Sequence, residues 1–277
     1  VAIKVLLQSN EGKEITLLQE AKAAARLSHG NIVQIYDIFE EGNKTFIVME
    51  YVRGKSLKQL ISAQEGTPFT EQRALQLGMK LASALNHAHL NGVIHRDIKP
   101  DNIIIDQDGE PKITDFGIAR VSNDTTIVHT DEILGSLRYS SPEQLRGAII
   151  DERADIFSLG IVLFEMLTGT MPFPDDSPVT AAFKKLKEDL PSVISINPEV
   201  SIQTDAIIAK ASDRDPKKRY ANMNEFYYAL AGALDSPKTY YKDTVVLPNN
   251  QVNPKVSPQI EYHRDETPTS SGGGKFF

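Results

Sequence analysis

The sequence predicts an α+β fold with two unequal parts. Before Tyr51, short runs rich in β-branched residues surround a single helical pattern, and such runs are typical of strands. From Glu71 to Leu234, by contrast, apolar residues recur mostly at helical spacing. A strand-rich part followed by a helix-rich part is typical of the α+β class, in which the two kinds of element are segregated along the chain.

The composition is that of an ordinary globular protein, and it excludes several kinds of site. The chain has 277 residues, of which 40% are hydrophobic and 24% are charged, and its formal net charge is −7. This charge argues against nucleic acid as a partner, because a nucleic-acid footprint needs a basic face. The sequence has no cysteine, so disulfides, thiolate metal sites and cysteine nucleophiles are excluded.

The strand-rich part is expected to hold three strands and one helix. Val1–Leu7 is a short apolar run rich in β-branched residues and predicts a strand. Glu14–Leu27 carries apolar residues at helical spacing and predicts a helix. Two further strands, Ile32–Phe39 and Lys44–Tyr51, are joined by Glu-Glu-Gly-Asn, which is a turn signal. A hinge is expected at Tyr51–Lys55.

The longer part is expected to be mainly helical. Glu71–Leu90 predicts an amphipathic helix, and Ile103–Ile105 and Lys112–Thr114 predict two short strands around a turn. From Asp155 the pattern is helical up to Leu234.

The end of the chain differs in character. Residues 236–277 contain five prolines and a Ser/Gly cluster without sustained periodicity. This composition predicts a linker or a disordered tail.

Two motifs carry the expected chemistry. The first, His-Arg-Asp-Ile-Lys-Pro-Asp-Asn, spans His95–Asn102, and the second, Asp-Phe-Gly, begins at Asp115. Phosphoryl transfer from ATP depends on positioning and charge neutralisation more than on covalent chemistry. Asp97 could accept the proton of a hydroxyl, and Lys99 could meet the γ-phosphate. Asn102 and Asp115 offer the oxygen ligands that Mg²⁺ prefers. The alternative, polar residues in ordinary turns around a hairpin, does not explain both motifs at this spacing.

With these motifs, the chain resembles the eukaryotic-type protein kinase family, whose motifs it matches in order up to Leu234. The resemblance implies a bilobal protein kinase fold, with a truncated, β-rich N-lobe at residues 1–52 and a larger helical C-lobe at residues 53–235. Residues 236–277 would form a juxtamembrane-like linker. The implied activity is ATP-dependent phosphorylation of Ser and Thr in protein substrates, with ATP and Mg²⁺ (or Mn²⁺) as cofactors.

The resemblance also assigns roles near the phosphates of ATP. Lys4, in Val-Ala-Ile-Lys, would hold the α- and β-phosphates, and Glu20 would pair with this lysine. Asp97 would be the catalytic base and Lys99 the γ-phosphate contact. The metal ligands would be Asn102 and Asp115.

An adenine site is implied as well. Met-Glu-Tyr-Val, at residues 49–52, resembles the gatekeeper and hinge of the family. The backbone of Met49, Glu50 and Val52 would then bind the adenine edge. The base would lie between Ala2 and Ile104.

Five residues receive structural roles by the same resemblance. Ser-Pro-Glu stands for the Ala-Pro-Glu motif of the family, so Glu143 would have Arg219 as its buried partner. Asp155 would hold the catalytic loop by accepting backbone N–H groups. His95 would be a core residue packed on Phe116.

The segment between the Asp-Phe-Gly and Ser-Pro-Glu motifs is rich in hydroxyl groups. Phosphorylation of Thr130 first, and of Thr125 or Thr126 next, is expected to order this segment through Arg96, because a phosphate pairs well with arginine. Ser136 stands where the family usually has Thr beside the base. It is therefore expected to contact the base region and to favour Ser and Thr over Tyr acceptors.

Within the family, the chain is most similar to bacterial transmembrane kinases that carry extracellular PASTA repeats. This likeness implies a cytoplasmic kinase domain and a single-pass parent protein, with membrane attachment only if a transmembrane segment follows. A homodimer for autophosphorylation of the activation loop is a further expectation. No apolar run of about 20 residues, the length needed to span a bilayer, is present.

The sequence departs from the family at its start, where no Gly-rich phosphate loop precedes Val1. We expect a fragment of an ordinary kinase, with a natural short form that binds ATP poorly as the alternative. Two rival functions stay open: a pseudokinase or binding scaffold with the same fold, and a small-molecule phosphotransferase with the same catalytic core.

Overall fold

The computed structural model describes residues 1–7, 14–116, 135–174, 177–236 and 238–240, and side chains within these ranges except those of residues 7 and 14–18. The described residues belong to one compact unit. The strands are β1 (Ala2–Leu7), β2 (Ile35–Glu41), β3 (Lys44–Met49), β4 (Gly54–Ser56), β5 (Ile103–Asp106) and β6 (Pro111–Ile113). The helices are α1 (Glu14–Ala24), α2 (Leu57–Ala63), α3 (Glu71–Leu90), η1 (Pro100–Asn102), α5 (Pro142–Leu145), α6 (Arg153–Thr168), α7 (Pro178–Lys187), α8 (Ile202–Ala211), η3 (Pro216–Lys218) and α9 (Met223–Asp235).

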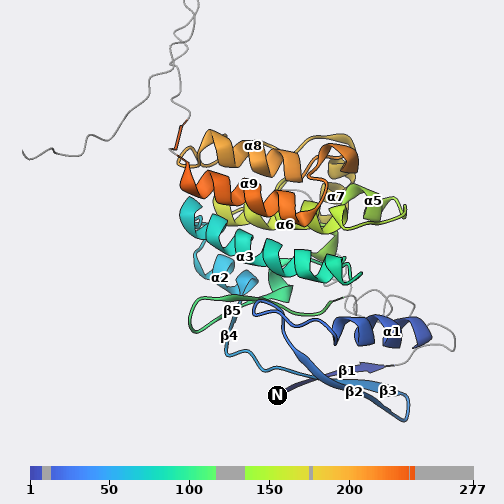
Figure 1. Cartoon of the computed structure of the whole chain (residues 1–277). Coiled ribbons are helices and arrows are strands. Elements are labelled where there is room, and N and C mark those ends of the chain that lie inside the picture. Colours follow the sequence, from blue (N-terminus) through green and yellow to red (C-terminus); the bar gives the residue numbers. More distant parts are fainter. Residues whose placement is uncertain (8–13, 117–134, 175–176, 237, 241–277) are drawn as a thin grey trace, which may run out of the picture. The chain divides into compact units, whose positions relative to one another are not determined.

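The N-terminal sheet has the strand order β1-β3-β2, with both pairs antiparallel. The register places Ala2 opposite Met49, and β2 and β3 form a hairpin that turns at Gly42, whose φ of +60° suits a residue without a side chain. Val33, Ile47 and Met49 are buried at the centre of this part. Figure 1 shows α1 beside the sheet, as the predicted N-lobe requires.

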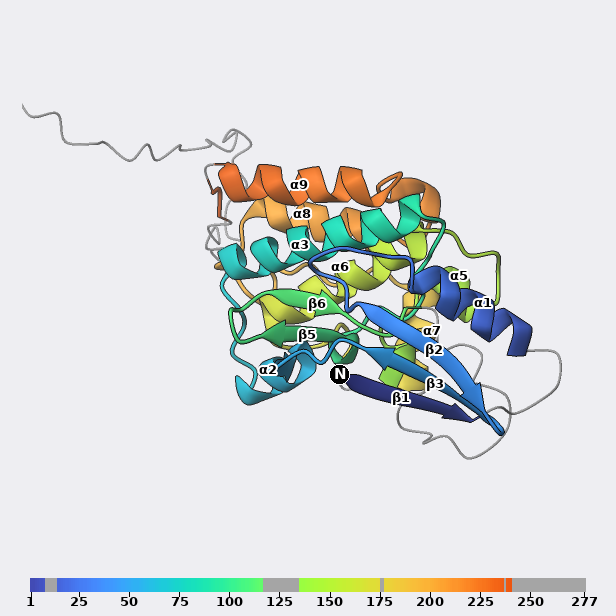
Figure 2. The same ribbon diagram turned by 60° about the horizontal axis from the view of Figure 1, so that its bottom comes forward.

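A second sheet, β4-β5-β6, belongs with the helices. Figure 2 shows β5 and β6 lying between α2 and α3. Its link to the first part is a parallel bridge between Ile32 and Ile113, supported by a 2.9 Å bond from the Val33 N–H to the Ile113 carbonyl. This pairing explains why the strand predicted from Ile32 begins instead at Ile35. The residues before it are paired with β6.

The C-terminal part is built around α6, whose residues from Ala154 to Thr168 are all buried. The helices α3, α8 and α9 pack around it, and α9 also packs against both α3 and α8 (Figure 1). On α3 the predicted apolar face is buried at Ala74, Leu77, Leu81, Leu85 and Ala88. Within the described ranges, no helix combines the length and the apolar character needed to cross a lipid bilayer.

The predicted fold class is confirmed, while several element boundaries differ. The first helix ends at Ala24 instead of Leu27, where the chain enters a turn. Sequence analysis missed β4, because Gly-Lys-Ser has no apolar run, and it also missed the short helix α2. β4 exists through its pairing with β5, against which Gly54 packs so closely that an added Cβ would lie 2.1 Å from the Ile105 carbonyl oxygen. The short helix α5 was also missed.

The first residues of the predicted linker contact the helices. The Ile202 N–H donates to the Thr239 carbonyl at 2.9 Å, and the Lys238 ammonium pairs with the buried Glu71 carboxylate at 2.7 Å. Burial would raise the pKa of Glu71, but the hydrogen bonds from Lys238 and from neighbouring hydroxyls lower it. The boundaries proposed after residues 52 and 235 stay predictions.

Glu143, at the start of α5, forms a buried ion pair with Arg219. Two bonds of 2.7 and 2.9 Å join the carboxylate to the guanidinium, whose side chain has no exposed surface. Burial alone would raise the pKa of Glu143, but the bonds and charge of Arg219 lower it. Arg219 also donates to the carbonyls of Asp213 and Arg153, so it ties α5 to α6 and to the loop before η3.

Removing this pair should destabilise the protein strongly. We expect Glu143→Ala to lower the free energy of unfolding by about 3–5 kcal/mol, because it leaves a buried guanidinium uncompensated. The matched control is Asp189→Ala, whose pair with Arg214 is largely exposed and should contribute less than about 1 kcal/mol. Urea unfolding followed by circular dichroism gives both values. Equal losses in the two variants would contradict the structural role of the buried pair.

Candidate active site

The loop between α3 and η1 is fixed by the carboxylate of Asp155, on the first turn of α6. Oδ2 accepts from the His95 N–H and Oδ1 from the Arg96 N–H, each at 2.8 Å, and His89 Nε2 donates to Oδ2 at 2.8 Å. Arg96 has a φ of +67°, an unfavourable conformation that persists only when the surroundings hold it. Asp155 is fully buried, and burial alone would raise its pKa. The bond and charge of His89, with the His95 N–H, lower that pKa instead.

His95 connects this loop to the Asp-Phe-Gly motif. Its side chain is buried, Nε2 bonds to the Thr114 carbonyl at 2.9 Å, and its ring packs edge-on against Phe116 with centroids 4.6 Å apart. The structure therefore places His95 and Phe116 in the core, where the resemblance put them.

Asp97, Lys99 and Asn102 come together in one cluster. The Lys99 ammonium lies 2.9 Å from Asp97 Oδ2, and Asn102 Nδ2 donates to the Asp97 carbonyl at 2.8 Å and to its Oδ2 at 3.0 Å. Lys99 also donates to Ser136 Oγ at 2.6 Å. The structure thus brings Ser136 next to Lys99, which is paired with Asp97.

Asp115 lies beside this cluster. The Thr114 N–H donates to the Asn102 carbonyl at 3.0 Å, which holds the strand before Asp115 against the end of η1. Asp115 has a φ of +65°, another strained backbone conformation. Its Oδ1 accepts from the Lys4 ammonium at 2.5 Å. This bond joins β1 to the Asp-Phe-Gly motif.

The partner expected for Lys4 is different. Glu20, on α1, is bound to Arg96 through a 2.7 Å contact between Oε1 and Nη1. The expected Lys4–Glu20 pair is therefore replaced by two others, Lys4–Asp115 and Glu20–Arg96. The orientation of α1 places Glu20 within reach of Arg96. The local sequence does not determine this orientation, so it could not predict the partner of Glu20.

The expected adenine-binding residues lie on both sheets and on the connection between them. Met49 is buried at the end of β3 opposite Ala2, and Ile104 is half-buried on β5. The Glu50 N–H is already bonded to the Gln34 carbonyl at 2.8 Å, so this group is not available to a base. The Glu50 carboxylate pairs with Lys112 at 2.8 Å. An adenine contact from Glu50 would therefore have to use its carbonyl, and the contacts expected from the backbone of Met49, Glu50 and Val52 stay predictions. Val52 follows on the connection, half-buried.

A divalent cation fits the side chains that the structure brings together. Because Asn102 Nδ2 faces Asp97, its Oδ1 is the atom left for a metal, and Asp115 supplies a carboxylate. In the described part of the chain, no group of three or more His, Asp or Glu residues could hold a metal ion. A metal here would therefore complete its shell with substrate phosphates and water, as Mg²⁺ usually does.

The remaining predicted residues divide into two groups. Glu143, Arg219 and Asp155 form the buried contacts described above. Thr125, Thr126 and Thr130 lie outside the described residues, so their phosphorylation stays a prediction.

Sequence reasoning missed three side chains that fix the loop at Arg96 or the segment before α5. Gln144 Nε2 donates to the Arg96 carbonyl at 2.7 Å, Tyr139 donates to Glu165 at 2.6 Å, and Lys185 binds backbone carbonyls of the segment before α5. A Ser-x-x-Gln capping box at Ser141 could have located Gln144. No sequence signal identifies the other two, whose partners are distant in the chain.

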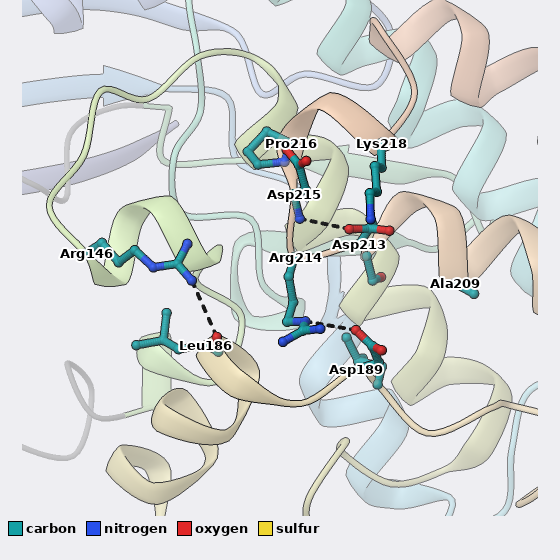
Figure 3. Close-up of a pocket in the computed structure, with 11 residues that line it drawn as sticks. Arg146, Leu186, Asp189, Ala209, Asp213, Arg214, Asp215, Pro216 and Lys218 are labelled. Atoms are coloured by element: carbon teal, nitrogen blue, oxygen red, sulfur yellow. Dashed lines mark hydrogen bonds and ion pairs between the residues drawn. The ribbon is translucent and has the colours of Figure 1, made fainter.

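A separate cavity of about 660 Å³ lies between α7, α8 and η3 (Figure 3). Arg146, Asp189 and Arg214 contribute to its lining. It contains none of the predicted site residues.

Comparisons with known proteins show what the whole chain is similar to. A family model for the protein kinase domain matches residues 1–227. The serine/threonine-protein kinase PrkC of Bacillus subtilis is 41% identical across 99% of this chain and 42% of its own length. The probable serine/threonine-protein kinase PknB of Lactococcus lactis is 38% identical across 96% of this chain and 44% of its own. The chain therefore spans about two fifths of the length of these curated relatives.

A solved structure shows the fold independently. The kinase domain of Mycobacterium tuberculosis PknI superposes with a TM-score of 0.67, with 24% identity, over 83% of this chain and 84% of that one. The predicted likeness to bacterial serine/threonine kinases is confirmed by these relatives. PASTA repeats and a membrane segment stay predictions.

The Asp155 anchor gives a testable stability effect. We expect Asp155→Asn to lower the free energy of unfolding at neutral pH by about 1.5–3 kcal/mol, because an amide cannot accept all three charged or backbone bonds. The pKa of Asp155 is lowered in the folded state. Its contribution is therefore present above about pH 4, the ordinary value, and is lost as the pH falls through the folded value.

Asp155→Asn should lose less stability on acidification than the original chain. The control is Glu152→Gln, an adjacent acid whose side chain makes no capping bond. Urea unfolding at a series of pH values measures both. A pH dependence in Asp155→Asn identical to that of the original chain would contradict the anchor.

Proposed function

Because the chain belongs to the protein kinase domain family, we propose that it transfers the γ-phosphoryl group of ATP to Ser and Thr hydroxyls of proteins. The observation that carries the proposal is the cluster in which Asp97 touches both Lys99 and Asn102, with Asp115 held beside it. An acid, a cation and two oxygen ligands are the groups that phosphoryl transfer from ATP uses.

Each residue of the cluster has a chemical task. The Asp97 carboxylate accepts the proton of the incoming hydroxyl as its oxygen bonds to phosphorus. The Asn102 amide keeps that carboxylate oriented through its bond to Oδ2. The Lys99 ammonium neutralises charge on the phosphoryl group being transferred, and its second bond, to Ser136, fixes its position.

Asn102 and Asp115 would hold the divalent cation, Mg²⁺ in the first place and Mn²⁺ as the alternative. When bound, the cation neutralises charge on the β- and γ-phosphates. Lys4 would bind phosphate oxygens of the nucleotide. In the present arrangement it is paired with Asp115, so nucleotide binding has to separate this pair.

A protein is the favoured substrate class over a small molecule. The segment from Ser136 leads directly into α5, and Glu143 fixes α5 to Arg219. This well-anchored surface next to the base suits a polypeptide. A pseudokinase role is not favoured, because Lys4, Asp97, Asn102 and Asp115 are all present and grouped.

The base can be tested directly. We expect Asp97→Asn to reduce phosphate transfer from radiolabelled ATP to a Ser/Thr protein acceptor by about 10²- to 10⁴-fold, the usual share of general-base catalysis. Nucleotide binding should be kept. The control is Asp101→Asn, an exposed acid four residues further along the chain, on η1. Transfer to aminoglycosides but not to proteins would favour the small-molecule alternative, and undiminished transfer by Asp97→Asn would contradict the assignment.

We also propose that phosphorylation of the segment holding Thr125, Thr126 and Thr130 acts through Arg96. A phosphate on this segment would compete with Glu20 for the Arg96 guanidinium, since it carries about −1.5 to −2 charge. Glu20 would then be free to pair with Lys4, in the arrangement that the family resemblance implies. The support for this route is that Arg96 already holds Glu20 at 2.7 Å.

This route predicts that Arg96 carries the activation. We expect phosphatase treatment to lower kcat by about tenfold or more in the original chain, and Arg96→Gln to remove most of that difference. The control Arg26→Gln changes an exposed arginine near α1. This variant should show the same difference in kcat as the original chain. Transfer rates before and after phosphatase treatment, with mass-spectrometric mapping, make the measurement. An unmodified segment in fully active protein would contradict the route.

A homodimer for autophosphorylation, a cytoplasmic location and membrane attachment of a longer parent stay predictions.

A further inference from the structure

Lys185 is a buried lysine with an unusual set of partners. It lies on α7, and 2% of its surface is exposed. Its Nζ lies 2.8 Å from each of three backbone carbonyl oxygens, those of Leu137, Arg138 and Ser140. An ammonium group has three N–H donors, so all of them are used on one short segment of backbone.

The segment that Lys185 binds starts at the candidate active site. Ser136 Oγ accepts from Lys99, which is paired with Asp97. The polypeptide on either side of an acceptor hydroxyl at Asp97 must therefore pass close to residues 136–140. The shape of this segment decides which chains can lie there.

Side chains of two helices fix the carbonyls of this segment. Between the carbonyls that Lys185 binds, the Tyr139 carbonyl accepts from Ser158 Oγ on α6 at 3.0 Å. The Tyr139 hydroxyl donates to Glu165, also on α6, at 2.6 Å. Four successive carbonyls are thus bound by side chains rather than by a strand or helix, and Lys185 supplies three of those bonds.

The helix that carries Lys185 is itself held at its end. Arg146 donates to the Leu186 carbonyl at 3.4 Å, and Arg214 donates to Asp189 at 2.8 Å (Figure 3). Arg214 also donates to the Lys187 carbonyl at 2.5 Å. Lys185 therefore extends from a helix whose C-terminal end is bonded to two neighbouring segments. Its three bonds can transmit the position of α7 to the segment.

The charge of Lys185 matters to this arrangement. Burial, with a smaller contribution from the charge of Arg138, lowers its pKa to about 7. Two arginines lie nearby. Arg138 belongs to the segment that Lys185 binds, and Arg219, which is paired with Glu143, lies against the same Phe157 ring at 4.8 Å while Lys185 Nζ lies 5.7 Å from it. A neutral amine has two N–H donors and a lone pair. Deprotonation therefore removes one of the three bonds and directs a lone pair at a carbonyl oxygen.

We propose that Lys185 is a positioning residue that determines the affinity for the protein substrate, by holding residues 136–140 in the form that receives the polypeptide around the acceptor hydroxyl. The inference rests on the proposed kinase function and deepens it. Lys185 acts through the segment and does not touch the reacting atoms.

The test compares Lys185→Met with Lys187→Met, which removes the same charge from an exposed position on α7. Steady-state transfer to a Ser/Thr acceptor peptide without titratable side chains is measured in the full chain. We expect Lys185→Met to raise KM for the peptide by about tenfold or more while kcat and KM for ATP change little, and amide exchange at residues 136–140 to become faster. Lys187→Met should behave as the original chain.

A second readout uses the titration of the lysine. In the original chain, KM for the peptide should rise between about pH 6 and pH 8.5 as the ammonium loses its proton, whereas KM for ATP should not. In Lys185→Met this rise should be absent. If Lys185→Met fails to fold, the pH profile of the original chain decides, and a flat profile overturns the inference.

The outcomes separate this inference from the proposed function. Transfer by the original chain with an unchanged peptide KM in Lys185→Met overturns the role of Lys185 alone. An equal loss of peptide and ATP affinity in Lys185→Met would assign Lys185 a general stabilising role. That result would also overturn the inference that Lys185 is a positioning residue. A chain that binds ATP but transfers no phosphate overturns the proposed function, and the inference with it.

Discussion

The carboxylate of Asp155 is the contact on which the geometry of the candidate active site depends. It stands on α6, which is buried along its length, and it binds the N–H groups of two consecutive loop residues. The loop thereby gains the rigidity of the helical core, and Arg96 can keep a backbone conformation that costs free energy elsewhere. Through the His95 ring and the Thr114 carbonyl, the same anchor reaches the Asp-Phe-Gly motif. One buried acid thus positions both the loop that leads to Asp97, the proposed base, and the segment that leads to Asp115, a proposed metal ligand.

Four charged side chains near this anchor can pair in two ways. The structure has Lys4 with Asp115 and Glu20 with Arg96, whereas the family resemblance implies Lys4 with Glu20. Exchange to the Lys4–Glu20 pair releases Asp115 and Arg96. The number of ion pairs need not fall if a metal ion then binds Asp115 and a phosphate binds Arg96. A small difference in free energy then decides which arrangement is populated. Under the proposed function and regulation, added anions, whether nucleotide phosphates or a phosphorylated side chain, would bias the choice between the two arrangements.

Sequence reasoning succeeded where the determinants are local or periodic. The apolar period of α3 and the spacing of Asp97 and Asn102 lie within a few turns of chain, so the fold class and the cluster could be predicted. β4 has no apolar pattern and exists only through its partner strand, so it could not. The partner of Glu20 depends on the orientation of α1, and a lysine within a helix such as Lys185 reads as solvated until its neighbours are known. Contacts between segments that are distant in the sequence cannot be predicted from these local patterns.

The two buried cations, Arg219 and Lys185, show why the surface beside the base behaves as one unit. Both lie against the Phe157 ring of α6, and their bonds fix the two ends of the stretch from Leu137 to Glu143. A buried cation is tolerated only when its partners are complete. Loss of the Glu143 bonds would leave the Arg219 charge uncompensated in the core, whereas loss of the carbonyl bonds would favour the neutral form of Lys185. We therefore expect the stretch from Leu137 to Glu143 to form cooperatively. Its partners are two buried cations, and these cations are stable in the core only while the stretch is in place.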